Sequence, residues 1–151
     1  MIFDRTIFHV NESKKIFHNK ISKGEEPTPQ EQEILDRGFF GIGALNRIEQ
    51  KQLEVQNDLI ELGYWHKEPR NKIWDFGEWF TKEDLERIVN TNSELKKSFF
   101  VSREAPIDAV ASFYYEEINR IEKMLFDLET NANSAINNYR YCGTINCGGN
   151  I

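Results

Sequence analysis

Apolar side chains recur at every third or fourth position in three stretches of the chain, a spacing that places them on one face of a helix. The first stretch runs from about Gly43 to Leu62, the second begins at Thr81, and the third follows Pro106. The positions on these faces are Leu45, Ile48, Gln52, Val55, Leu59 and Leu62, then Leu85, Ile88, Asn92, Leu95 and Phe99, then Ile118, Ile121, Leu125, Leu128, Ala132 and Ala135. The pattern predicts a mainly α fold, with three long helices bundled over residues 41–136.

Local signals support these helix boundaries. Thr81 and Asp84 form a near capping box, Pro106 suits a first helical turn, and Gly63 is a typical C-terminal stop. The helices also begin with similar residues, at 45–49, 85–88 and 118–122. A true repeat is one explanation, but the unequal spacing argues against a solenoid. We favour the interpretation that amphipathic helices reuse similar side chains around a core.

Two amides interrupt the apolar faces at the same ordinal place, Gln52 in the first helix and Asn92 in the second. Amides that meet inside a helical core fix the register of the helices at some cost in stability. If Gln52 and Asn92 meet, we expect them to do the same here. The acidic residues of the first helix, Glu49, Glu54 and Asp58 among them, are expected on its solvated face.

The first 40 residues form an N-terminal arm with short elements. Residues 6–10 are interpreted as a short strand or an extended arm, which could pair with a C-terminal strand, and residues 12–21 as a short helix. Thr28 and Glu31 form a capping box with Pro29 in the first turn, which predicts a helix ending at Gly38.

All three tryptophans lie in the connection between the first two long helices. A loop with so many aromatic side chains normally folds back over a core. The alternative is an exposed recognition loop formed by Tyr64, Trp65, Trp74 and Trp79.

After Asn133 the chain becomes rich in Asn and Gly, and residues 137–151 are predicted to form an extended C-terminal tail. Such a tail is either disordered or ordered by docking on a partner. The candidate docking residues are Tyr139, Tyr141, Cys142, Ile145, Cys147 and Ile151.

Composition narrows the function classes. The 151 residues carry 19 Lys and Arg against 25 Asp and Glu, a net charge of -6 that makes nucleic-acid binding a poor fit. No apolar run approaches the roughly 20 residues of a membrane span, and the first five residues lack the basic start and apolar stretch of a signal peptide. We therefore expect a soluble protein with no nucleic-acid or membrane partner.

Candidate catalytic chemistry is sparse. The three histidines are scattered, and Cys142 and Cys147 form a Cys-x4-Cys pair with no further ligands nearby, so that zinc would need ligands from a neighbour. The glycines at 38, 41 and 43 lack the lysine and hydroxyl of a phosphate loop. We expect no enzyme activity, no metal site and no cofactor.

Several short motifs follow one another in an order that resembles a known protein module. Residues 43–49 open a helix that closes at 59–64, Trp74-Asp75 follows, and residues 81–88 lead into Asn92, Leu95 and Phe99. This order resembles a module in structural proteins of tailed bacteriophages of Gram-positive hosts and of related phage-tail-like particles. Residues 141–148 are similar in spacing to a short Gly-containing C-terminal peptide in those proteins. The likeness covers about residues 38–101 and the last dozen; residues 1–37 have no counterpart.

The resemblance implies a virion structural protein of a tail, baseplate or tail fibre, whose partners are other virion proteins and copies of itself. It implies no catalytic residues. The alternatives are a head-to-tail connector ring protein of the virion and a cytoplasmic adaptor that binds through the aromatic loop. A metal-dependent enzyme or sensor would require stoichiometric zinc.

Overall fold

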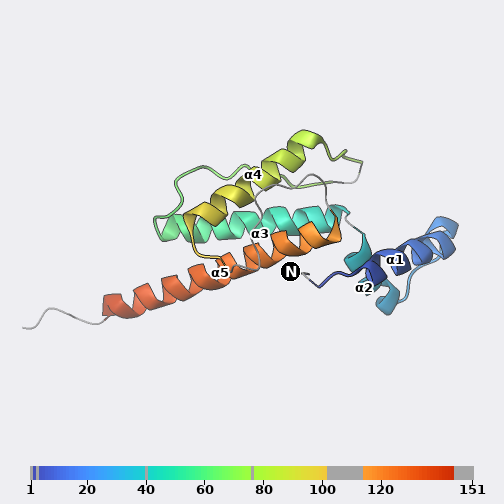
Figure 1. Cartoon of the computed structure of the whole chain (residues 1–151), viewed down its shortest axis with the longest axis horizontal. Coiled ribbons are helices and arrows are strands. Elements are labelled where there is room, and N and C mark those ends of the chain that lie inside the picture. Colours follow the sequence, from blue (N-terminus) through green and yellow to red (C-terminus); the bar gives the residue numbers. More distant parts are fainter. Residues whose placement is uncertain (1, 3, 40, 76, 102–113, 145–151) are drawn as a thin grey trace, which may run out of the picture.

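The chain folds as a series of helices along most of its length. The computed structural model describes residues 2, 4–39, 41–75, 77–101 and 114–144, and describes residues 139–144 by their backbone alone. Within these residues there is no strand. The helices are α1 (Ile7–Asn19), α2 (Pro29–Gly38), α3 (Ile42–Glu61), α4 (Lys82–Ser98) and α5 (Tyr115–Thr144), with a 3-10 turn at Ile21–Lys23 (Figure 1).

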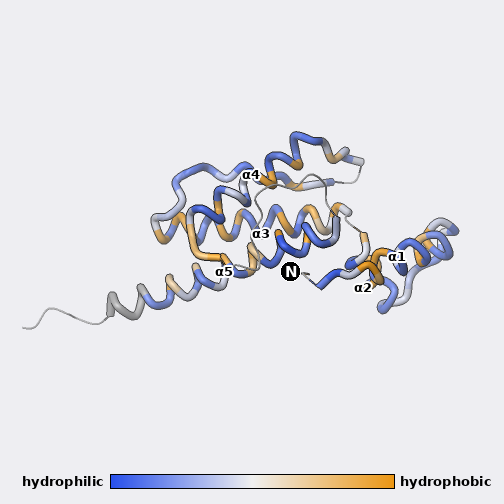
Figure 2. Tube along the Cα trace, in the orientation of Figure 1, coloured by the Kyte–Doolittle hydropathy of each residue, from blue (hydrophilic) through white to orange (hydrophobic). Residues whose placement is uncertain are grey.

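The three long helices share one hydrophobic core, and we call α3, α4 and α5 the helical body. Hydrophobic and hydrophilic residues alternate along each of them (Figure 2). The buried members of this core are Leu45, Ile48, Val55, Leu59, Trp65, Trp74, Ile88, Leu95, Ile118, Ile121, Met124, Leu125, Leu128 and Ala132. Most of the positions predicted from the periodicity are among them, and Leu62 and Phe99 pack against them. Leu85 and Ala135 are only half-buried and do not belong to the core. Each large side chain that is fully buried here contributes roughly 1.5–3 kcal/mol to folding.

The helix starts follow the capping signals of the sequence. The Thr81 hydroxyl accepts a hydrogen bond from the Asp84 N–H at 3.2 Å, and Thr81 donates back to the Asp84 carboxylate. Thr28 and Glu31 form the equivalent pair at the start of α2. Both predicted capping boxes are confirmed, while Pro106 lies outside the described residues.

The helices α1 and α2 form a hairpin at the N-terminal end of the molecule (Figure 1). The interpretation of residues 6–10 as a strand or extended arm is wrong, because α1 begins at Ile7. The face of α1 that includes Ser13 and Ile16 is buried, so packing against α2 outweighs the strand preference of Ile7 and Val10.

The end of α5 also differs from the prediction. Residues 137–144 continue the helix instead of starting an extended tail. Figure 1 shows this part of α5 extending past the ends of α3 and α4. Residues 145–151 lie outside the described part of the chain.

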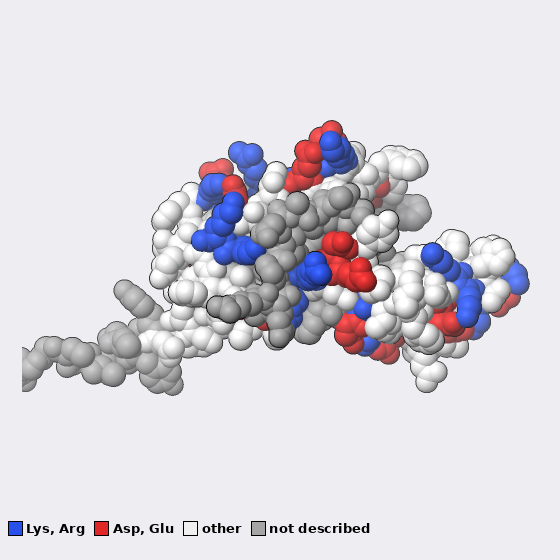
Figure 3. All heavy atoms as spheres, in the orientation of Figure 1, with Lys and Arg blue, Asp and Glu red and all other residues white. Residues whose placement is uncertain are grey.

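The surface carries no concentrated charge in the view of Figure 3, where acidic and basic side chains are interspersed over the hairpin and around α4. Among the described residues, no helix is both long and apolar enough to cross a membrane.

Candidate assembly site

The aromatic connection between α3 and α4 divides into buried and exposed members. Trp65 and Trp74 are 5% and 3% exposed and belong to the core, as expected for a loop folded back on the bundle. Tyr64 and Trp79 are 54% and 88% exposed. Only these two of the four candidate recognition residues are therefore available on the surface.

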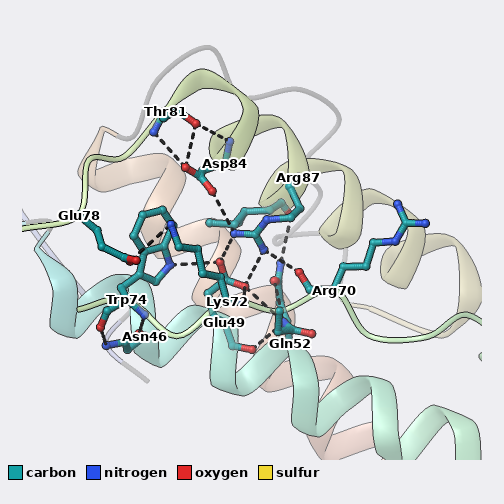
Figure 4. Close-up of polar contacts among 12 residues, drawn as sticks. Asn46, Glu49, Gln52, Arg70, Lys72, Trp74, Glu78, Thr81, Asp84 and Arg87 are labelled. Atoms are coloured by element: carbon teal, nitrogen blue, oxygen red, sulfur yellow. Dashed lines mark hydrogen bonds and ion pairs between the residues drawn. The ribbon is translucent and has the colours of Figure 1, made fainter.

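Trp74 is held on α3 through its backbone and its indole ring. The Asn46 side chain donates to the Trp74 carbonyl at 2.9 Å and accepts from the Trp74 N–H at 2.7 Å. One helical turn later, Glu49 accepts a hydrogen bond from the Trp74 indole N–H at 3.2 Å (Figure 4). The asparagine thus fixes the backbone of the loop at Trp74, and the glutamate fixes the indole ring.

Glu49 is buried, and its expected position on a solvated face is wrong. The Arg87 guanidinium of α4 donates to both carboxylate oxygens, at 2.8 and 2.5 Å, and the Lys72 N–H donates at 3.2 Å (Figure 4). This hydrogen-bonded pair raises the pKa of Arg87 above its ordinary value. Glu49 therefore joins α3, α4 and the aromatic loop. Its hydrogen bonds and its ion pair with Arg87 offset the free-energy cost of burying the carboxylate.

A second asparagine and glutamate on α5 hold the N-terminal arm in the same way. The Asn119 side chain donates to the Arg5 carbonyl at 2.8 Å and accepts from the Arg5 N–H at 3.1 Å. Glu122 accepts from the Arg5 guanidinium at 2.6 Å and from the Ile2 N–H at 3.0 Å. Arg47 of α3 donates to the other Glu122 oxygen at 2.9 Å.

The contacts of Asn46 and Glu49 and those of Asn119 and Glu122 come from the same four-residue sequence. Residues 46–49 and 119–122 both read Asn-Arg-Ile-Glu, and in each case the asparagine pairs with the backbone of an extended segment while the glutamate takes its side-chain donor. We call them the Asn-Arg-Ile-Glu clamps. The repeated Asn-Arg-Ile-Glu sequence was the signal for these clamps. Its interpretation as similar side chains reused by amphipathic helices missed their shared contacts.

Gln52 and Asn92 meet inside the core, a contact that the sequence left open. The Gln52 amide donates to the Asn92 side-chain oxygen at 2.8 Å and to the Ile88 carbonyl at 3.0 Å. Both side chains are fully buried. This pair sets the register of α3 against α4.

A groove of about 800 Å³ lies between the C-terminal ends of α3 and α4 and the adjacent part of α5. Its lining is mainly apolar, and it includes side chains left open to solvent: Phe100 is 79% exposed and Ile60 is 44% exposed. Tyr64 of the aromatic connection also lines it. The α5 wall consists of Asn131, Ser134, Ala135, Ile136 and Asn138.

The predicted docking residues follow the α5 wall of this groove in the sequence. Tyr139, Tyr141 and Cys142 belong to the last turns of α5, and the described structure covers their backbone only. Ile145, Cys147 and Ile151 lie outside the described residues. Among the residues that are described, no group of three or more His, Cys, Asp or Glu side chains could hold a metal ion.

Comparison of the chain with models of known protein families, with curated proteins and with solved structures finds no match.

Proposed function

We propose that this chain is a structural protein of a tailed bacteriophage or phage-tail-like particle, placed in the tail, baseplate or tail-fibre attachment. The order of motifs in residues 38–101 motivates the choice of particle. The observation that carries an assembly role is the open apolar groove beside the end of α5. A groove with large exposed apolar side chains is typical of surfaces that bind another protein.

The helical body supplies the rigidity that a repeated subunit needs. Its core is buried, and two buried carboxylates hold the α3–α4 connection and the N-terminal arm against it. Among the described residues, large apolar side chains are exposed in the groove and also in the α1–α2 hairpin, where Ile7 and Phe8 are 57% and 58% exposed. Contacts at two ends of one body are what a ring or a stack of copies requires.

The direct experiment is quantitative mass spectrometry of purified particles from the producing strain. The proposal predicts this chain in the particle at a fixed copy number that is a multiple of three or six. Its absence from particles, with the protein free in the induced or infected cell, would contradict the proposal. Localisation within the particle by cryo-electron microscopy would separate a tail or baseplate position from a connector ring.

A further inference from the structure

A small pocket of about 170 Å³ lies where the α1–α2 hairpin meets the start of α5. Arg5 of the N-terminal arm, Arg37 of α2 and Tyr115 of α5 are among the residues that line it, and none of its lining residues belongs to the apolar groove. Figure 1 shows the hairpin on the side of the helical body where α5 begins. We propose that this pocket binds a small oxyanion, a phosphate or a carboxylate, which joins the hairpin to the body.

Arg5 brings a positive charge that is enclosed by the protein. Its side chain is only 2% exposed, and its Nη1 atom donates to the Glu122 carboxylate at 2.6 Å. Its Nη2 atom is also buried and has no hydrogen-bond partner among the described residues. Because buried polar groups are almost always hydrogen-bonded, this nitrogen calls for an acceptor from outside the chain.

Glu122 alone does not neutralise the charges around it. Arg47 of α3 donates to the other Glu122 oxygen at 2.9 Å, so two guanidinium groups share one buried carboxylate. The Arg47 side chain is 29% exposed to solvent, whereas that of Arg5 is enclosed. A water molecule beside Arg5 would accept a hydrogen bond but leave the excess positive charge, and an anion would offset both.

The start of α5 adds hydrogen-bond donors to the same pocket, which is lined by Tyr114, Tyr115 and Ile118. The Ile118 N–H donates to the Tyr114 carbonyl at 3.0 Å, so the N–H groups of residues 115–117 have no acceptor within the helix. Free N–H groups and the helix dipole make such a helix start favourable for phosphate and carboxylate groups. The buried guanidinium and the helix start therefore favour the same kind of ligand.

The lining of the pocket favours an anion as well. Arg5 and Arg37 are its charged side chains, and none of the described residues that line it is acidic. Asp4 and Glu33, which pair with Arg37, are 63% and 66% exposed and lie outside the lining, as do the two glutamates in the first turn of α5. Since one water molecule takes up about 30 Å³, the pocket has room for one small anion.

Isothermal titration calorimetry of the full chain tests the site, with inorganic phosphate and with acetate at an ionic strength held constant by NaCl. Arg5→Lys keeps a positive charge beside Glu122 but removes the Nη2 donor. Arg70→Lys is the matched control, because Arg70 is exposed and lies outside the pocket.

We expect wild type and Arg70→Lys to bind one ion per chain with equal affinity, and Arg5→Lys to bind at least tenfold more weakly. The ion that wild type binds more tightly identifies the ligand as a phosphate or as a carboxylate. Equal binding by all three proteins, or no binding of either ion by wild type, would overturn the proposal.

Hydrogen exchange of the wild-type protein locates the site without any substitution. An anion in the pocket would contact the N-terminal arm, α2 and α5 together. We therefore expect the bound ion to slow exchange at the amides of residues 37–39 and 115–118, and to leave the amides of residues 60–64 in the apolar groove unchanged. Protection confined to other parts of the chain would overturn the proposal.

Discussion

Glu49 and Glu122 are buried carboxylates that hold together segments far apart in the sequence. Each accepts hydrogen bonds from an arginine of another element and from a backbone N–H of an extended segment. Removing one partner of such a pair costs about 3–5 kcal/mol, because the other charge stays buried and unpaired. The burial of these residues could not be predicted from the sequence, because a glutamate beside an apolar face has the pattern of a solvated residue, and only its tertiary partners place it inside.

The indole of Trp74 offers a test of the first clamp. Trp74→Phe removes the hydrogen bond to buried Glu49, whereas Trp65→Phe removes an indole N–H that has no hydrogen-bond partner among the described residues. Both substitutions shrink a buried ring, so their difference isolates the bond. We expect Trp74→Phe to lower the free energy of unfolding by about 1–3 kcal/mol more than Trp65→Phe, measured by urea denaturation. Equal losses in the free energy of unfolding would show that the hydrogen bond from the Trp74 indole to Glu49 does not stabilise the fold.

The Gln52–Asn92 pair allows a double-mutant test. Gln52→Leu leaves the Asn92 side-chain oxygen buried without its donor, and we expect a loss of about 1–3 kcal/mol in the free energy of unfolding. Adding Asn92→Leu removes that unpaired oxygen and should recover most of the loss. The measurement is urea denaturation of the two single variants and the double variant; additive losses would contradict the paired role.

At the scale of elements, the long helices were predictable because periodicity, capping residues and a terminal glycine agree with one another. The errors fall where propensity and packing disagree. Residues 6–10 look like a strand from their β-branched and aromatic side chains, yet α1 is a helix because its buried face packs against α2. Residues 137–144 look irregular from their Asn and Gly content, yet they extend α5.

Gly38, the last residue of α2, lies directly against α1. A Cβ at this position would overlap the Ser13 side chain and the His9 carbonyl of α1. We therefore expect Gly38→Ala to destabilise the α1–α2 hairpin by about 1–3 kcal/mol through overpacking. Gly43→Ala is the control, because a Cβ there meets open space and should leave stability unchanged or slightly higher. Hydrogen exchange of the α1 amides is the measurement, and similar protection in both variants would contradict this role.

The start of α2 should respond to pH. Hydrogen bonds from Lys20 and from the backbone and hydroxyl of Thr28 lower the pKa of Glu31 from 4.5 to about 2. Because this pKa is depressed in the folded state, the stabilisation is present above pH 4.5 and is lost as the pH falls towards 2. The melting temperature of wild type should exceed that of Glu31→Gln at pH 7, and the gap should close between pH 4.5 and 2. A gap independent of pH would contradict the assignment.

At the scale of the whole molecule, a rigid helical body carries surfaces at its two ends that find no cover within the described chain. The docking role of the C-terminal residues stays a prediction, and the part of this region that the structure describes is the helical end of α5 and not an extended tail. The groove was beyond sequence reasoning, because it forms only where the ends of α3, α4 and α5 diverge. Exposed apolar residues such as Ile60 and Phe100 line one groove only because the fold brings the ends of these helices together.

We propose that this protein assembles into a particle through the groove beside α5. The most direct measurement is the copy number of Phe100→Arg in purified particles, determined by mass spectrometry beside wild type and Ile73→Arg. Phe100→Arg places a charge in the groove, and Ile73→Arg is the matched control, because Ile73 is 89% exposed and lies outside the groove. We expect Ile73→Arg at the wild-type level and Phe100→Arg reduced at least tenfold, with both proteins folded and equally abundant in the cell. Incorporation of Phe100→Arg at the wild-type level would contradict the account.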